Sequence, residues 1–177
     1  MPPEPQPAQG NVFVMQQQLE SEWCWAAVAQ AIKTFFSPSS AVTQCQIAQP
    51  VVSMENPSLA ITNCCDDPTQ CNMPAYLQDA LNVTQNLSKI VDGDVPFDQL
   101  KSELSNGNPV GVRIQWSDGG AHFIAIDGYR EFSSGAQQVL VADPLDSAGS
   151  ASYIDYDDLV DFYDQDGVWD ATFLVKP

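Results

Sequence analysis

The amino-acid sequence predicts an α+β fold in which helices come first and an antiparallel sheet follows. Residues 23–36 are rich in alanine and apolar on almost every side, which is typical of a central buried helix. From residue 109 onward, apolar and β-branched runs are separated by Gly, Ser and Asp turns, as expected of an antiparallel meander. We therefore expect a helical part over residues 12–108 and a sheet part over residues 109–177.

Proline residues mark most of the expected helix boundaries. Pro38 should end the first helix, and Pro50 should end a short helix that Thr43 caps. Pro74 and Pro96 stand at first-turn positions of two later helices. After the first helix, the expected helices span residues 43–48, 75–81, 97–104 and 157–163, and residues 51–72 are expected to be irregular.

The second half of the chain contains segments with the composition of β-strands, bounded by turn residues. The expected strands span residues 110–116, 122–129, 137–142, 152–155 and 168–175. We expect consecutive strands to pair, with the last one closing the sheet.

The composition describes a globular chain of one domain. With 177 residues, 44% of them hydrophobic, the chain has enough apolar material for a sizeable core. No stretch approaches the roughly 18 consecutive apolar residues of a membrane span, and no apolar secretory leader follows Met1. The Pro- and Gln-rich residues 1–11 are expected to form a flexible arm before a domain over residues 12–177.

The formal net charge of −17 restricts the possible partners. Six basic side chains stand against 23 acidic ones, so the surface repels nucleic acids and anionic membranes. Such a charge favours cationic peptides or basic protein surfaces, although it is also commonly a matter of solubility. We therefore expect neither nucleic acid nor membrane as a partner.

The five cysteines divide into one isolated residue and a cluster. Cys24 stands alone, whereas Cys45, Cys64, Cys65 and Cys71 fall within one short segment. The cluster lacks the paired C-x-x-C spacing of metal sites, so it predicts two disulfides, a secreted protein and a free thiol at Cys24. Adjacent Cα atoms are only about 3.8 Å apart, too close for Cys64 to pair with Cys65. Two connectivities remain open: Cys45–Cys64 with Cys65–Cys71, or Cys45–Cys65 with Cys64–Cys71.

Cys24 and His122 are the candidate nucleophile and base. Cys24 begins the buried helix, where the helix N-terminus and a nearby imidazolium stabilise a thiolate. His122 is the single histidine and follows two glycines, which would let a substrate backbone approach the ring. Six residues before the thiol, Gln18 can direct its amide at an oxyanion beside the Cys24 N–H. Gln16 and Gln17 are neighbouring alternatives to Gln18. Taken alone, Cys24 and His122 are each as well explained by a structural role.

The group that orients the imidazole is expected to be an aspartate. Asp127 is close to His122 in sequence, but an offset of five residues along one strand places it on the opposite face. Asp143 ends the next strand, and an antiparallel hairpin can bring it opposite Ile124, on the face of His122. We therefore expect Asp143 to be the third residue. A register slip of one residue would move it to the opposite face of the sheet.

Taken together, these segments resemble the papain-like cysteine peptidases. The resemblance is carried by Gln18 six residues before Cys24, by Trp25-Ala26, by His122 with Gly128-Tyr129, and by Asp143-Pro144. The compact length and the Asp-Pro ending look more like bacterial members, such as the peptidase domains of bacteriocin exporters and secreted effector proteases of plant pathogens. The likeness implies a papain-like fold, in which a helical lobe with a central nucleophile helix packs on a C-terminal antiparallel sheet. The implied roles are oxyanion stabilisation, nucleophile, base and orienting group for Gln18, Cys24, His122 and Asp143.

The resemblance therefore implies a thiol peptidase that acts on peptide or protein substrates without a cofactor or metal. We expect it to be monomeric, and the cysteine cluster predicts that it is secreted. Two alternatives remain open. The same constellation serves deamidases, isopeptidases and acyl transferases, which an assay of released ammonia against released α-amines would separate. A non-catalytic acidic binding module with the same fold is the other alternative, and labelling of Cys24 with a thiol-directed epoxide would test it.

Overall fold

The computed structural model describes residues 11–61 and 63–177, so all but the last residue of the expected arm lies outside the described residues. In chain order, the elements are α1 (Cys24–Phe36), α2 (Gln44–Glu55), the short 3-10 helix η1 (Pro68–Cys71), α3 (Leu77–Val83), β1 (Leu87–Asp92), α4 (Phe97–Ser105), β2 (Val110–Gln115), β3 (Ala121–Glu131), β4 (Gln137–Ala142), β5 (Ser152–Asp155), α5 (Tyr156–Asp161) and β6 (Val168–Val175). The prediction of an α+β fold is confirmed: helices dominate the first half, and the second half carries most of an antiparallel sheet, which is consistent with a papain-like fold.

The sheet has six strands in the order β1-β6-β2-β3-β4-β5, and every neighbouring pair is antiparallel. Strands β2 to β5 form the expected meander. Strand β6 was expected to close the sheet, but it lies between β2 and β1 instead. Strand β1 was not predicted, because it is an edge strand with mostly exposed side chains and no buried alternation in its sequence.

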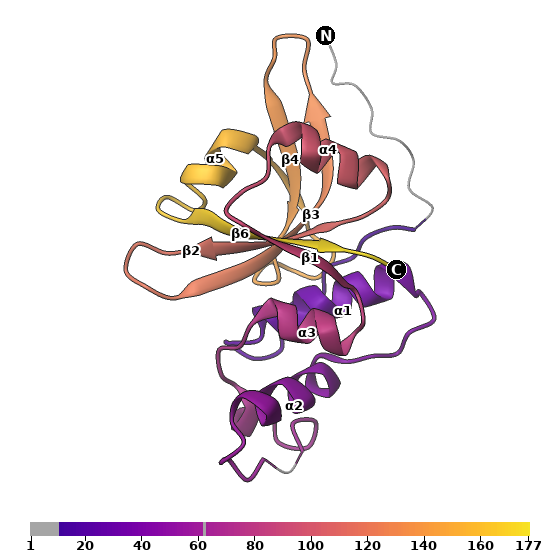
Figure 1. The fold of residues 1–177 in the computed structure, drawn as a ribbon, viewed down its shortest axis with the longest axis vertical. Coiled ribbons are helices and arrows are strands. Elements are labelled where there is room, and N and C mark those ends of the chain that lie inside the picture. Colours follow the sequence, from indigo (N-terminus) through magenta and orange to yellow (C-terminus); the bar gives the residue numbers. More distant parts are fainter. Residues whose placement is uncertain (1–10, 62) are drawn as a thin grey trace.

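The sheet separates two hydrophobic cores. Helices α1, α2 and α3 lie on one side of the sheet, and α4 and α5 lie on the other (Figure 1). Strand β3 contributes to both, because Phe123 and Ala125 pack in the core of α1 whereas Ile124 and Ile126 pack in the opposite core. The first residues of β3 therefore lie where the helical layer meets the sheet.

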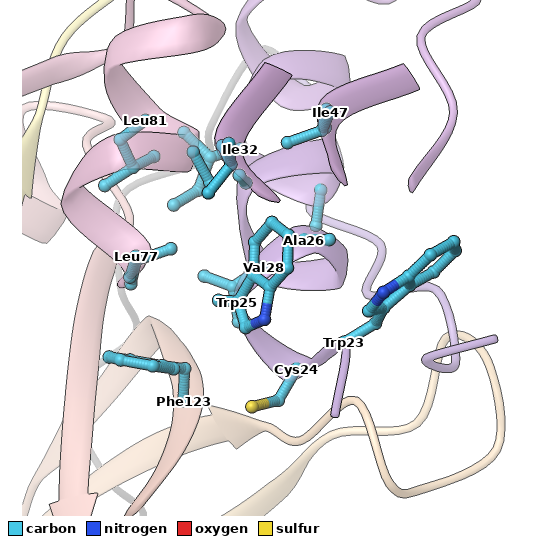
Figure 2. Packing of buried hydrophobic residues seen from close by; sticks show 14 of the residues in the cluster. Trp23, Cys24, Trp25, Ala26, Val28, Ile32, Ile47, Leu77, Leu81 and Phe123 are labelled. Carbon is cyan, nitrogen blue, oxygen red and sulfur yellow. The ribbon is translucent and has the colours of Figure 1, made fainter. Parts of the chain in front are cut away.

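Helix α1 is the centre of the helical layer, as its alanine-rich sequence predicts (Figure 2). Its start is fixed by two fully buried tryptophans. The indole N–H of Trp23 donates to the Cys71 carbonyl at 2.8 Å, and that of Trp25 donates to the Met73 carbonyl at 3.4 Å. A buried indole N–H requires such a partner, so the two rings tie the beginning of α1 to the end of η1 and to the segment that follows it.

Helix α2 does not end at Pro50, as the sequence analysis expected, but continues through it to Glu55. The capping box at Thr43 starts the helix as predicted, because the Thr43 hydroxyl accepts from the Gln46 N–H and the Gln46 side chain accepts from the Thr43 N–H. Proline removes one helical hydrogen bond. The burial of Val51 and Val52 in the core of α1, both 0% exposed, offsets that loss.

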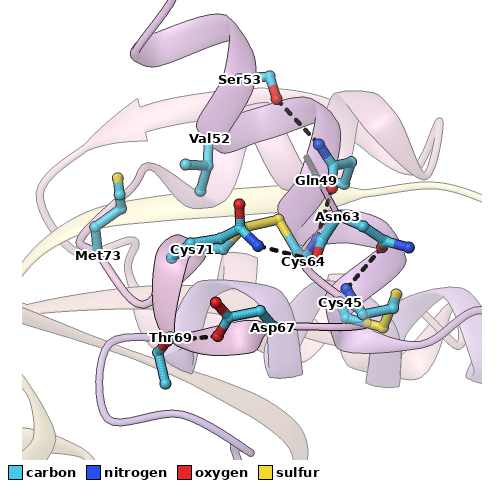
Figure 3. Close-up of a disulfide and its surroundings, with 12 residues drawn as sticks. Cys45, Gln49, Val52, Ser53, Asn63, Cys64, Asp67, Thr69, Cys71 and Met73 are labelled. Atoms are coloured by element: carbon cyan, nitrogen blue, oxygen red, sulfur yellow. Dashed lines mark hydrogen bonds between the residues drawn. A yellow bond between two sulfur atoms is a disulfide. The ribbon is translucent and has the colours of Figure 1, made fainter. Parts of the chain in front are cut away.

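Two disulfides close the segment between α2 and η1 (Figure 3). Cys45 pairs with Cys65, and Cys64 pairs with Cys71, which is the second of the two connectivities left open by the sequence. Cys24 is the free cysteine. The two bridges start from adjacent residues and reach in different directions, one to the first turn of α2 and the other to the end of η1.

In the part of the chain that the structure describes, no helix is long and apolar enough to span a membrane.

Candidate active site

Cys24 is the first residue of α1 and is 8% exposed. Figure 2 shows its sulfur at the end of the helix that faces the sheet, beyond the ring of Trp25. The N–H groups of the first helical turn have no acceptor within the helix, and they make this end of α1 electropositive. A thiolate at Cys24, or an oxyanion beside it, is therefore stabilised by the helix on which the thiol is carried.

His122 is the second residue of β3, and Nε2 of its ring lies 2.8 Å from Oδ1 of Asp143. The side chains of His122 and Asp143 are 8% and 12% exposed, so this contact is nearly dry. The Cys24 side chain is a further hydrogen-bonding partner of His122. Because Asp143 occupies Nε2, Nδ1 is the nitrogen left for the thiol. The structure thus brings together the three residues that the sequence singled out.

The pKa of His122 is raised to about 9. Burial alone would lower it, because a charged imidazolium is poorly solvated in a protein interior. The hydrogen bond that the ring donates to Asp143 and the interaction with Cys24 outweigh burial and favour the protonated ring. The site therefore favours a positively charged imidazole next to the thiol, which is the partner that a thiolate requires.

Asp143 is held by three hydrogen bonds besides its position in the chain. Its Oδ1 accepts from His122 and from the Leu145 N–H, and its Oδ2 accepts from the Tyr163 hydroxyl at 2.6 Å. Burial favours the protonated acid, but these donors, His122 first among them, hold the pKa of Asp143 below its usual range. The carboxylate is therefore ionised and fixed in orientation.

The strand register explains why Asp143, and not Asp127, contacts the imidazole. Ala125 pairs with Ala142, so continuing the ladder by one residue brings Asp143 opposite Ile124, as expected from the sequence. A bulge in β3 falls at Asp127, between the paired residues on either side of it. The bulge shifts the register by one residue between the hairpin turn and this segment, since Gly128 pairs with Leu140 whereas Ile126 pairs with Val141. It is this shifted register that brings Asp143 opposite Ile124. Burial raises the pKa of Asp127 to about 6.

Gln18 lies in the extended segment before α1, and its side chain is bonded within that segment. The amide nitrogen donates to the carbonyls of Glu20 and Ser21 at 2.9 and 2.7 Å. These two carbonyls fix which side of the amide is the nitrogen, since a flipped amide would place oxygen against oxygen. A substrate oxyanion would have to share or replace one of these acceptors.

The segment containing Gln18 is attached to the loop that follows Asp143. The Gln18 N–H donates to the Pro144 carbonyl at 2.8 Å, and the Gly149 N–H donates to the Met15 carbonyl at 2.8 Å. Two residues that are far apart in the sequence, Gln18 and Asp143, are thereby positioned by the same short stretch of paired backbone.

Two hollows flank the Cys24–His122 pair. One, of about 680 Å³, lies on the imidazole side and includes His122, Asp143, Trp116, Tyr163 and Phe162 in its lining. The other, of about 420 Å³, lies on the thiol side and includes Cys24, Trp25, Phe123, Tyr76 and Gly120. A chain that crosses from one hollow to the other would pass the thiol and the imidazole.

The two glycines before His122 were expected to let a substrate backbone approach the ring, and both have a backbone conformation that favours glycine. Gly119 and Gly120 have φ values of +98° and +82°, in the region that favours glycine, and no heavy atom lies within 4 Å of where a Cβ would be. The rim of the thiol-side hollow at Gly120 is thus open backbone, free of side chain.

Two residues next to the site were not found by sequence reasoning. Tyr163 was expected inside a helix, but α5 ends at Asp161 and Tyr163 forms an isolated bridge with Gly167. Trp116 stacks against it with ring centroids 6.3 Å apart. Gly167 is the signal that could have indicated this contact, because a Cβ there would lie 2.6 Å from the Trp116 ring. The turn that carries Tyr163 therefore requires glycine at this position, because any side chain would meet Trp116 and the Tyr163 carbonyl.

Within residues 11–61 and 63–177, no group of three or more His, Cys, Asp or Glu side chains is arranged to hold a metal ion. The residues gathered at the candidate site carry nucleophilic and acid–base chemistry of their own. We derive the proposed reaction from them.

An α+β fold with a thiol on a central helix, beside an imidazole on a neighbouring strand, is consistent with the class of papain-like cysteine peptidases. A sequence profile of the Peptidase_C39 like family matches residues 11–173, which includes both sides of the candidate site. The chain therefore belongs to the Peptidase_C39 like family, and this membership supports cysteine peptidase activity in general. A search of curated proteins found no match.

Proposed function

We propose that this protein is a cysteine peptidase that hydrolyses peptide bonds with Cys24 as nucleophile, His122 as acid and base, and Asp143 as the orienting group. The observation that carries the proposal is the buried hydrogen bond between His122 Nε2 and Asp143 Oδ1, with Cys24 as the other partner of the ring. Three residues separated by 98 and 21 positions meet in the order that nucleophilic catalysis requires.

The proposed reaction proceeds in two halves. The thiolate of Cys24 attacks the substrate carbonyl carbon, and the His122 imidazolium gives its proton to the departing amine. Water then attacks the acyl-enzyme, with the now neutral imidazole as the base that takes its proton. The Asp143 carboxylate stabilises the imidazolium throughout and keeps Nδ1 directed at the sulfur.

We propose that Gln18 and the Cys24 N–H stabilise the oxyanion that forms during both halves. The Cys24 N–H is a first-turn helix donor without an intrahelical acceptor, which supports its part of the role. Gln18 precedes the thiol by six residues and is fixed to the loop of Asp143. Its amide donates to two backbone carbonyls in the free protein, so it would be recruited only when the oxyanion develops.

We further propose that the protein is secreted and acts as a monomer, as one of the compact bacterial members to which its motifs are similar. The support for secretion is the pair of disulfides, which are consistent with an extracellular protein. Its substrates would be peptides or proteins, and a net charge of −17 makes nucleic acid an unfavourable partner.

The test is turnover of a mixed peptide library, followed by mass spectrometry of the products and by separate assays of new α-amines and of ammonia. New α-amines that form with the native protein and not with Cys24→Ala support the proposal. Ammonia without new α-amines would assign the same residues to deamidation. Joined peptides with no net rise in α-amines would assign them to acyl transfer. An absence of all three products, together with no labelling of Cys24 by a thiol-directed epoxide, would contradict an enzymatic role.

A further inference from the structure

Gln44 is a buried polar side chain that the proposed chemistry does not use. It is the first residue of α2, it is 1% exposed, and its amide reaches out of the helix toward the segment before α1. A buried amide that found no partners would be costly, so the contacts it makes describe what it holds in place.

The Gln44 amide is bonded to the backbone on both sides of Gln18. Its Nε2 donates to the Gln17 carbonyl at 2.9 Å, and its Oε1 accepts from the Leu19 N–H at 2.9 Å. On the other side of the same segment, the Gln18 N–H donates to the Pro144 carbonyl. Three consecutive residues of an extended segment are therefore fixed between one side chain and the loop of the candidate orienting aspartate.

The start of α2, which carries Gln44, is itself held in place at both neighbours of Gln44. Thr43 forms the capping box that starts α2, and Cys45 is tied to Cys65 by a disulfide. The Gln44 amide also lies 3.3 Å from the Gln30 side-chain oxygen of α1. The amide is thus attached to a rigid helix end, and its hydrogen bonds in a dry environment are stronger than they would be in water.

From these contacts we infer that Gln44 is a positioning residue for the proposed oxyanion hole, acting through the backbone of Gln18. This inference rests on the proposed function, because Gln18 must stabilise the oxyanion for its placement to affect the rate. Gln44 does not reach the reacting atoms itself. Its part is to keep the Gln18 backbone at a fixed position relative to Cys24 and the Asp143 loop, since small displacements of a catalytic donor are costly in rate.

The test is a double-mutant cycle with Gln44→Met and Gln18→Ala. Methionine keeps the volume of glutamine and removes its polar contacts with Gln17, Leu19 and Gln30. Epoxide titration of Cys24 counts the folded sites, so that rates are compared per active site. We expect Gln44→Met to lower kcat about tenfold with KM nearly unchanged. In the Gln18→Ala background, the same change should lower kcat less than twofold, because the interaction that it positions is already absent.

Gln46→Ala is the matched control, because it removes only the Gln46 side-chain bond of the capping box. The Thr43 hydroxyl still accepts from the N–H of residue 46 and the Cys45–Cys65 disulfide remains, so the anchor of Gln44 is kept and the Gln18 segment is not touched. It should lower thermal stability and leave kcat per titrated site unchanged. If Gln46→Ala lowers kcat as much as Gln44→Met, or if Gln44→Met and Gln18→Ala are additive, Gln44 is only structural. Should Gln44→Met fail to fold, Gln44→Glu takes its place, since it retains an oxygen for the Leu19 N–H and loses the Nε2 donor to Gln17 and Gln30.

A readout that does not depend on turnover separates this inference from the proposed function. The side-chain NH₂ signals of Gln18 can be assigned in an NMR spectrum by their loss in Gln18→Ala. We expect Gln44→Met to shift or broaden them and Gln46→Ala to leave them in place. If they move in this way while no substrate is turned over, the positioning holds and the proposed function fails. Unmoved signals in Gln44→Met would overturn the inference.

Discussion

The layer that carries the thiol and the sheet that carries the imidazole are stabilised in different ways. The chain between α2 and α3 is largely irregular, and it is held by two disulfides and by the indole hydrogen bonds of Trp23 and Trp25. The sheet from β2 onward has no cysteine and depends on backbone ladders and a continuous apolar core. Covalent links thus occur where regular hydrogen bonding is sparse. The candidate site depends on both kinds of stabilisation, because its thiol lies in the helical layer and its imidazole lies in the sheet.

The largest effect should come from the thiol, on the helical side of the site. We expect Cys24→Ala to lower kcat/KM at least about a thousandfold, because the sulfur is a reactant. The thermal unfolding midpoint should hardly change, since alanine fits the space at the end of α1. Measurement of both quantities on one preparation separates chemistry from stability, and a variant that kept most of its activity would remove Cys24 from the mechanism.

Removal of the disulfides should affect the helical side far more than the sheet. Replacing Cys45 and Cys65 with serine opens a link with a sequence separation of 20, and we expect the free energy of unfolding to fall by about 3 kcal/mol. The shorter Cys64–Cys71 link should contribute about 2 kcal/mol. Hydrogen exchange with and without reductant measures where protection is lost. Equal loss of protection in α2 and in β2–β4 would contradict the conclusion that the disulfides stabilise the helical layer and not the sheet.

The pH dependence of stability and activity tests the sheet side of the site, because it reports the charge of the His122 imidazole. The pKa of His122 is raised from 6.5 to about 9, so its protonation contributes stability that is fully present below about pH 6.5 and is lost as the pH rises through about 9. The alkaline limb of the activity profile should lie in the same upper range. Asp143→Asn should move that limb to lower pH and reduce kcat/KM at its new optimum, but less than Cys24→Ala does, because asparagine can still accept from the imidazole N–H.

An unmoved alkaline limb in Asp143→Asn would mean that Asp143 is not what keeps the ring protonated. A complete loss of activity in a folded variant would mean that the negative charge itself is required, and that an asparagine cannot substitute as an acceptor for the ring N–H.

The smallest effect should come from the hydroxyl behind the carboxylate. Tyr163→Phe removes the 2.6 Å donor to Asp143 Oδ2 and should lower the free energy of unfolding by about 1.5 kcal/mol. Tyr153→Phe keeps its ring beneath Arg130 and serves as the matched control. Denaturant titration measures both variants. A larger effect of Tyr153→Phe would show that the hydroxyl of Tyr163 contributes little to the fixation of Asp143.

The parts of the molecule that could be predicted are those with a repeating physical pattern. The alanine-rich run predicts α1, and the alternation of faces along β3 predicts that Asp143 lies next to His122. That face argument depended on Asp143 lying opposite Ile124, and the β-bulge at Asp127 contributes to this register. Next to the hairpin turn Gly128 pairs with Leu140, whereas beyond the bulge Ile126 pairs with Val141, so without the bulge Asp143 would lie opposite Ala125, on the other face.

The remaining features depend on contacts between distant residues. Pro50 was read as a helix end because proline breaks local hydrogen bonding, and only the buried Val51 and Val52 explain why α2 continues. Tyr163 reaches Asp143 from a turn whose position is set by the close approach of Gly167 to Trp116. Gln44 lies in a helix start that its sequence predicts, but nothing local indicates that it binds the backbone next to Gln18.

The hydrogen bond from Gln18 to the Pro144 carbonyl turns the candidate site into a closed circuit. From Cys24, one passes to His122, to Asp143, across to Gln18 and back along six residues of chain to the thiol. If the residues were linked only from Cys24 through His122 to Asp143, displacements would add up toward Asp143. Because the Gln18 backbone also binds the loop of Asp143, each displacement must be compatible with both connections. The positions of the Cys24 thiol and the Asp143 carboxylate are therefore coupled twice, through His122 and through the backbone from Gln18 to Cys24. A substrate that displaces one of them also strains the contacts of the other.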